Sequence, residues 1–188
     1  KKDYRDVSYI IEKCHSNYLF YKKIDNLTKN NNFKEAIEVC QNYQLANSEN
    51  DFIEVIIADC YLNLKMYDVA LEHYKQHLKS SPNNFEINSQ LGLCHIFLGN
   101  IKIGEQLIYS SYKKSNTNPT CLKNLGILHL VKHSSKTALH FFKASKSKKR
   151  DLSMIDFYLA YTNKKLSKDK EYLYYLSKHK IKNCINNS

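Results

Sequence analysis

Apolar side chains recur three and four positions apart over residues 51–84, the spacing of helices that bury one face. In the first half of this stretch they are Phe52, Ile53, Ile56, Ile57, Cys60, Tyr61 and Leu64. In the second half they are Val69, Ala70, Leu71, Tyr74 and Leu78. The second run stops at Pro82, because proline lacks a donor N–H and disfavours helical geometry in the residue before it. The pattern therefore predicts a helical hairpin.

This hairpin recurs along the chain at a constant step of 34 residues. The seventh and eighth places of later units are Leu91-Gly92, Leu125-Gly126 and Leu159-Ala160, and the twentieth places include Ala36, Ala70 and Ala138. Small residues belong there because the paired helices approach closely at these places. The step divides the chain, without insertion or deletion, into the frames 17–50, 51–84, 85–118, 119–152 and 153–186.

The pattern resembles the tetratricopeptide repeat, in which small and aromatic residues stand at fixed places of a helical hairpin. In the frame 51–84 these places hold Ala58, Tyr61, Ala70, Tyr74 and Pro82. The resemblance implies an all-α fold, a right-handed α-α superhelix (a solenoid) of about five helical hairpins over residues 17–186. Ile24 in the first frame and Tyr172 in the fifth depart from the pattern, since small residues are expected there.

Residues 1–16 carry Val7, Ile10, Ile11 and Cys14 at helical spacing. We expect an N-terminal capping helix here, because the ends of a solenoid otherwise expose apolar surface. A docking peptide is the alternative. Since the sequence opens on Lys1 and not on Met, we expect an excerpt or a processed product.

Composition narrows the choice of protein class. Only 4 Gly and 2 Pro leave little material for the turns of an all-β fold. No run reaches the roughly 18 apolar residues needed to cross a bilayer. Cys60 and Cys94 both stand tenth in their frames, as small core residues would, and no CxxC pair occurs. Free thiols in a helical array predict a reducing, cytoplasmic location.

Candidate chemistry is sparse. The sequence has no glycine-rich phosphate loop, no nucleophile elbow and no HExxH motif. His73 with His77, and His129 with His133, have the spacing that presents two imidazoles on one helix face, but no nearby carboxylate clearly supplies a further zinc ligand. We therefore expect no enzyme activity, no metal and no cofactor.

The resemblance also implies that the first helices of successive hairpins line a concave groove. The predicted partner-binding residues at its places are Val55, Asp59, Leu62, Ser89, Leu93, Ile96, Lys123, Ile127, Leu130, Phe157 and Tyr161. Many are apolar although Leu91, Cys94 and Leu98 already fill a core face, so the first helix of the third frame is apolar nearly all round. Such a helix is either buried on both sides or exposed for a ligand. The alternative to a binding groove is that tight curvature, or residues 1–16, covers it.

Charge is uneven along the chain. Residues 1–118 carry 14 basic and 14 acidic side chains, whereas residues 119–188 carry 15 and 4 and so supply the whole net charge of +11. A basic patch is predicted at Lys143, Lys146, Lys148, Lys149 and Arg150. This charge is either a solvated face or attracts an acidic flank of a partner. RNA or DNA binding is a further alternative, disfavoured because Arg occurs only at Arg5 and Arg150.

These observations predict a non-catalytic protein–protein interaction scaffold that binds a peptide or helix of a partner in its concave groove. Short arrays of this kind resemble the chaperones of bacterial type III secretion, and longer ones resemble subunits of larger complexes, so both remain alternatives. The sequence does not identify the partner or the oligomeric state.

Overall fold

A computed structural model describes residues 4–46, 52–148 and 154–186, with side chains from Ile11 to His179. These residues form helices and no strand, which confirms the all-α expectation. The helices are α1 (Tyr4–Lys29), α2 (Phe33–Ala46), α3 (Phe52–Asn63), α4 (Tyr67–Ser80), α5 (Phe85–Phe97), α6 (Ile101–Lys114), α7 (Pro119–Val131), α8 (Ser135–Lys148), α9 (Ile155–Lys165) and α10 (Asp169–Asn186).

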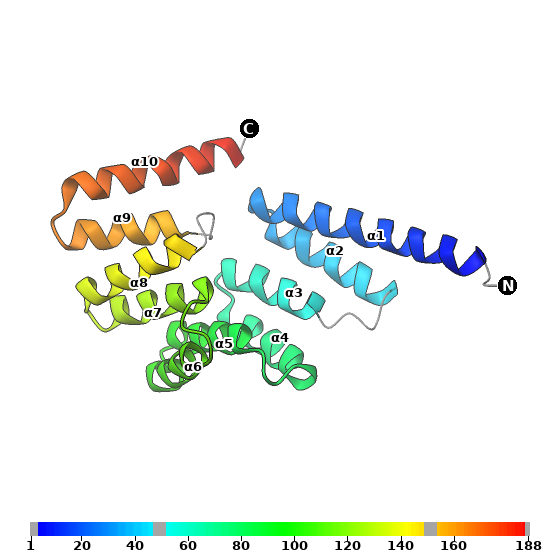
Figure 1. The fold of residues 1–188 in the computed structure, drawn as a ribbon, viewed down its shortest axis with the longest axis horizontal. Helices are drawn as coiled ribbons and strands as arrows, with labels where there is room; N and C mark the ends of the chain where they lie inside the picture. Colours follow the sequence, from blue (N-terminus) through cyan, green and yellow to red (C-terminus); the bar gives the residue numbers. More distant parts are fainter. Residues whose placement is uncertain (1–3, 47–51, 149–153, 187–188) are drawn as a thin grey trace.

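Consecutive helices pair into five hairpins, from α1–α2 to α9–α10, and each hairpin packs on the next (Figure 1). The hairpins follow one another in an arc, as the predicted solenoid requires. We call the first helix of each pair the inner helix and the second the outer helix. Among the inner helices, α7 also contacts both α5 and α9 directly.

The N-terminal helix differs from the expectation. Helix α1 runs without a break from Tyr4 to Lys29, so residues 4–16 are its first half and not a separate capping helix. Ile11 is 63% exposed, and the first buried side chain among those described is Phe20. Phe20 stacks on Tyr43 of α2 with ring centroids 3.9 Å apart. The contact between α1 and α2 is therefore seen in the second half of α1.

Small residues lie where the paired helices meet, as predicted. Ala36, Ala70 and Ala138 are fully buried. The twentieth place of the third frame is Gly104, and a Cβ built there would lie 2.5 Å from the carbonyl oxygen of Gly92. This approach is closer than any Cβ tolerates, so α5 and α6 depend on both glycines.

The turn inside each hairpin has one residue in the left-handed region. These residues, the fifteenth of each frame, are Asn31, Lys65, Gly99, His133 and Ser167, with φ between 56° and 85°. A left-handed residue after a helix lets the chain reverse while its N–H groups satisfy the last carbonyls. The Lys65 N–H, for example, donates to the Leu62 carbonyl at 3.1 Å. Only one of the five is glycine, so packing of the hairpin imposes the conformation on the others.

Candidate functional site

The predicted groove residues all lie on the inner helices α3, α5, α7 and α9, or at their ends. The chain itself buries much of their apolar surface. Val55, Leu93, Ile96 and Ile127 are only 3–5% exposed. The half-buried Leu62 and Leu130 pack against the cluster that contains Leu93, Ile127 and Phe142. Leu62 therefore packs α3 on a cluster formed by residues of α5, α7, α8 and α9, and these groove places belong to the core.

A polar network occupies the middle of the same surface. The Tyr74 hydroxyl donates to the carboxylate of Asp59, and the amide of Gln90 approaches the same oxygen at 3.4 Å. Gln90 in turn accepts a hydrogen bond of 2.9 Å from Asn124. Asn124 also donates to the hydroxyl of Ser89 at 3.0 Å. The network joins three hairpins through polar groups, so Asp59 and Ser89 have a structural role at the predicted site.

Burial raises the pKa of Asp59 above its ordinary value of 3.8, although the Tyr74 hydrogen bond and the Lys123 charge act in the opposite direction. The folded chain therefore binds this proton more tightly than the unfolded chain. Stability from protonated Asp59 is fully present below about pH 4 and is lost as the pH rises through the folded-state pKa. Because the unfolded chain releases this proton at lower pH than the folded chain does, the raised pKa disfavours the folded chain at neutral pH.

Asp59→Asn is therefore expected to be as stable as the wild type near pH 4, and more stable at pH 7. Asparagine keeps an acceptor for Tyr74 but carries no charge. Urea unfolding of both proteins at several pH values between 4 and 7 measures the difference. A difference that does not change with pH would contradict the expectation.

Asp156→Asn is the matched control, with the opposite expected sign at pH 7. Asp156 is 3% exposed and its carboxylate pairs with Lys146 of α8. Removing one partner of a buried ion pair leaves the other charge uncompensated. The control variant should therefore be less stable than the wild type, which separates loss of an unfavourable charge from loss of a carboxylate in general.

The last inner helix carries the groove aromatics that stay accessible. Phe157 and Tyr161 are 38% and 42% exposed and stack on each other at 6.3 Å between ring centroids. The ammonium of Lys165 lies 5.3 Å from the centre of the Tyr161 ring, and His179 of α10 lies 5.6 Å from Phe157. We call Phe157, Tyr161, Lys165 and His179 the aromatic site. It offers flat apolar surface beside a cation, which suits an apolar side chain next to a carboxylate.

The predicted site lacked two of these four residues. Lys165 follows Tyr161 by four residues, a helical spacing that could have revealed it. His179 comes from another helix, and no local pattern indicates its place. Phe52, 55% exposed at the start of α3, and Tyr21, 37% exposed on α1, are further accessible aromatics of the inner helices.

The predicted basic patch is only partly described. Lys149 and Arg150 lie outside the described residues. Lys146 pairs with Asp156 and lies 5.0 Å from the Tyr175 ring centre, so it connects α8 to α9 and α10. Lys143 and Lys148 are exposed. The patch therefore contributes surface charge at these two lysines, and Lys146 contributes to the core.

The histidine pair of α4 has local partners, and the repeated cysteines are buried. Nδ1 of His73 lies 2.7 Å from Glu54, and Nε2 of His77 lies 3.3 Å from Asn84. Burial raises the pKa of Cys60 and of Cys94 to about 12, so both thiols stay protonated at neutral pH. Both are core residues, as predicted. Within the described part of the chain, no three His, Cys, Asp or Glu residues are grouped to hold a metal ion.

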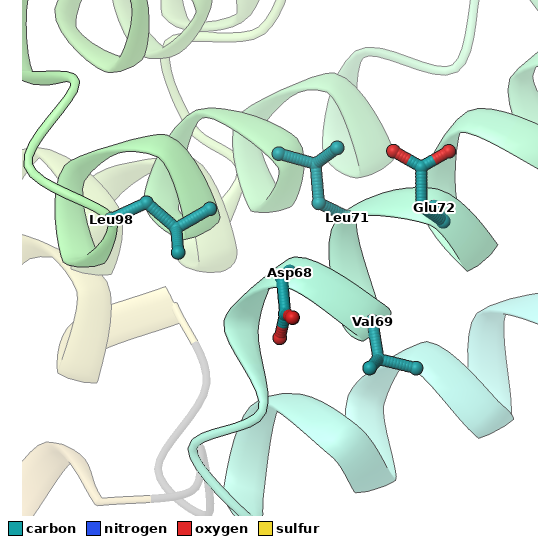
Figure 2. A pocket seen from close by; sticks show the side chains of 5 residues that line it. All are labelled: Asp68, Val69, Leu71, Glu72 and Leu98. Atoms are coloured by element: carbon teal, nitrogen blue, oxygen red, sulfur yellow. The ribbon is translucent and has the colours of Figure 1, made fainter.

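An open pocket of about 360 Å³ lies between α4 and the end of α5 and is lined by none of the predicted groove residues (Figure 2). It is lined by Asp68, Val69, Leu71, Glu72 and Leu98. Asp68 stands in the first turn of α4, where a carboxylate stabilises a helix, and Glu72 pairs with Lys75 at 2.9 Å. Its acidic residues are thus explained without a ligand. None of the helices searched in the described residues has the length and apolar character of a membrane span.

Several solved protein structures have a fold similar to that of this chain. A thermophilic TPR protein of Thermus thermophilus matches with a TM-score of 0.66 and 15% identity, over 78% of this chain and 80% of its own. A chain of the APC/C hetero-tetramer Cut9-Hcn1 matches with a TM-score of 0.64 and 18% identity over 80% of this chain, which spans 30% of that longer one. MamA of Desulfovibrio magneticus RS-1 matches with a TM-score of 0.54 and 12% identity, over 91% and 97%. No protein-family model and no curated protein matches the sequence.

Proposed function

Because this chain folds as a tetratricopeptide-repeat solenoid, we propose that it is a non-catalytic scaffold that binds a segment of a partner protein on its inner surface. The aromatic site is the observation that carries the proposal. Phe157 and Tyr161 keep about two-fifths of their surface exposed on an inner helix, whereas the apolar groove residues of α5 and α7 are mostly buried. A partner segment would remove this remaining apolar surface from water.

The charge around the aromatic site favours an acidic flank on the partner. Lys164 of the same helix lies 5.5 Å from the ring centre of Tyr172, so with Lys165 two cations of α9 lie close to aromatic rings. The nearby Asp156 is buried and paired, so it offsets little of this surface charge. A carboxylate-bearing segment would be attracted by this field, and its approach would be faster at low salt.

The polar groups in the middle of the inner surface would orient a bound peptide and add little to its affinity. Asp59 and Lys123 are both partly exposed there. The positive charge of Lys123 acts on Asp59 strongly enough to oppose the rise in its pKa. A peptide crossing this region would exchange hydrogen bonds with water for hydrogen bonds with these groups, at little net gain. We therefore place most of the binding free energy at the aromatic site.

The double variant Phe157→Ser/Tyr161→Ser is expected to lose its partner and to remain folded. Covering the exposed part of the two rings contributes roughly 2 kcal/mol, or about a 30-fold change in affinity. Tagged wild type and variant are used to isolate partners from the source organism, and the recovered proteins are quantified by mass spectrometry. Ile103→Ser on α6, where Ile103 is 48% exposed, is a control that removes apolar surface elsewhere.

A partner recovered equally by the wild type and the double variant would contradict this location of the site. Retention of arbitrary RNA, with affinity that falls steeply as salt rises, would instead favour nucleic-acid binding. A place in a larger assembly is the second candidate function, since the Cut9-Hcn1 neighbour belongs to a hetero-tetramer. Co-purification of the same subunits in fixed ratio would favour that second function.

A further inference from the structure

Each hairpin before the last contacts the next hairpin through the residue at the twenty-first place of its frame. At the twenty-first place of three frames stand Ile37, Leu71 and Leu139, each 5–6% exposed. Each belongs to a buried cluster that includes the following inner helix: Ile37 with Ile53 and Ile57, Leu71 with Ile87 and Leu91, and Leu139 with Ile155 and Leu159. The remaining frame has Glu105 at this place, and it pairs with Lys132 at the end of α7 at 2.7 Å. The twenty-first place is therefore an inter-hairpin contact in every case.

The twenty-fourth place is covered as well. Its residues in the first four frames, Cys40, Tyr74, Ile108 and Phe142, are all 0% exposed. Phe142 shows what covers this place, since its ring stacks on Tyr158 of the next inner helix at 5.2 Å. Both places lie on the face of an outer helix that points along the array.

The last outer helix leaves the same face uncovered. Leu173, at the twenty-first place of α10, is 60% exposed, and Leu176 at the twenty-fourth place is partly exposed. The neighbouring Tyr174 is 54% exposed, but its counterparts, including Glu72 and His140, are exposed in every earlier hairpin. Only Leu173 and Leu176 are therefore more exposed than their counterparts in the earlier hairpins. We call these two side chains the end face.

The opposite end of the array is built differently. Inner helices pack on the preceding outer helix through their third, seventh and tenth places, which are Ile53, Ile57 and Cys60 in α3. In α1 the same places are Leu19, Lys23 and Asn26, of which two are polar. A polar outer surface is how a solenoid ends in water. By this comparison the outer face of α1 is polar at two of three places, whereas that of α10 carries leucine at both.

We propose that the end face of α10 binds an amphipathic helix of a partner protein, laid where the inner helix of a sixth hairpin would lie. The covered hairpins define the chemistry of this helix: Ile or Leu at two positions four apart, as in Ile53/Ile57, Ile87/Leu91 and Ile155/Leu159. Asp169 and Lys170, four and three residues before Leu173, are both exposed beside the end face, so a helix with an acidic side chain facing Lys170 and none facing Asp169 complements the site. This surface is separate from the aromatic site, and the inference does not rest on it.

The test uses the whole chain and a fluorescent peptide of residues 51–65 with the substitution Cys60→Ser. This peptide carries Ile53 and Ile57 among acidic residues, and its helix covers the corresponding face of α2. Fluorescence anisotropy should show saturable binding with a dissociation constant of roughly 100 µM. Leu173→Glu should weaken binding at least tenfold, and a peptide with Ile53→Glu and Ile57→Glu should not bind.

Tyr174→Glu is the matched control, because it adds the same charge beside the end face at a place that stays exposed in every hairpin. It should bind the peptide with less than a threefold loss, and Phe157→Ser should bind it like the wild type. Equal losses for Leu173→Glu and Tyr174→Glu would overturn the proposal, as would absence of saturable binding. Sedimentation that shows a dimer dissociated by Leu173→Glu would also overturn it, since a second copy would then occupy the face.

Discussion

Replacing Gly104 with alanine is expected to destabilise the chain by about 2 kcal/mol, although alanine is the better helix former. A Cβ at this position lies 2.5 Å from the carbonyl oxygen of Gly92 and 2.6 Å from Cγ1 of Ile96. The crowded oxygen belongs to the backbone of α5, so the whole helix must move and the contacts of Ile96 and Cys94 loosen. Overpacking of this kind costs about 1–3 kcal/mol or more, against roughly 1 kcal/mol gained in helix propensity.

Urea unfolding followed by circular dichroism measures the change. Lys102→Ala, on an exposed position of the same helix, is the control and should leave stability within about 0.5 kcal/mol. A Gly104→Ala protein as stable as the wild type would mean that α5 and α6 pack less closely than described.

Phe142→Ala is expected to cost about 4 kcal/mol, the upper part of the range for truncating a buried aromatic ring. Phe142 is 0% exposed, stacks on Tyr158 and lies over Gly126. A Cβ on Gly126 would lie 2.6 Å from Cδ1 of the Phe142 ring. The ring and the glycine are therefore mutually required, and their substitutions are not additive.

The effect of Gly126→Ala on stability is expected to change sign when Phe142 is removed. In the wild type, Gly126→Ala should destabilise because the ring has no room to retreat. In the Phe142→Ala background the ring is absent, so the added methyl meets a cavity and alanine's helix propensity gains up to about 1 kcal/mol. A double-mutant cycle from four unfolding curves measures both effects. Destabilisation by Gly126→Ala in both backgrounds would contradict the close contact.

The constant step of 34 residues made most of the fold predictable. Small residues at the eighth and twentieth places predict where helices meet, and Pro82 predicts the end of a hairpin. The predicted boundary at residue 16 was set by the frame and not by a helix-breaking residue, and the helix continues to Lys29. No Gly or Pro occurs between Tyr4 and Lys29, and this is the local reason for one continuous helix.

The candidate site was less predictable because exposure depends on curvature. Frame places indicate on which side of a helix Leu93 or Ile127 lies. They do not indicate that Leu62 of α3 packs on the cluster to which both side chains belong, or how deeply that cluster is buried. Likewise the pairing of Lys146 with Asp156 joins residues whose separation no helical spacing relates. Phe157 and Tyr161 were predicted by place, and their exposure comes from the structure.

The five left-handed turn residues constrain how such a chain can change its length. Since Asn, Lys, Gly, His and Ser all adopt this conformation at the fifteenth place, the side chain there is free to vary while the residue count is not. One extra residue within either helix would rotate the positions after it by about 100° and carry part of the apolar stripe into water. Growth or shortening by whole 34-residue units preserves every contact between neighbours, so the architecture favours gain or loss of complete hairpins over single-residue insertions.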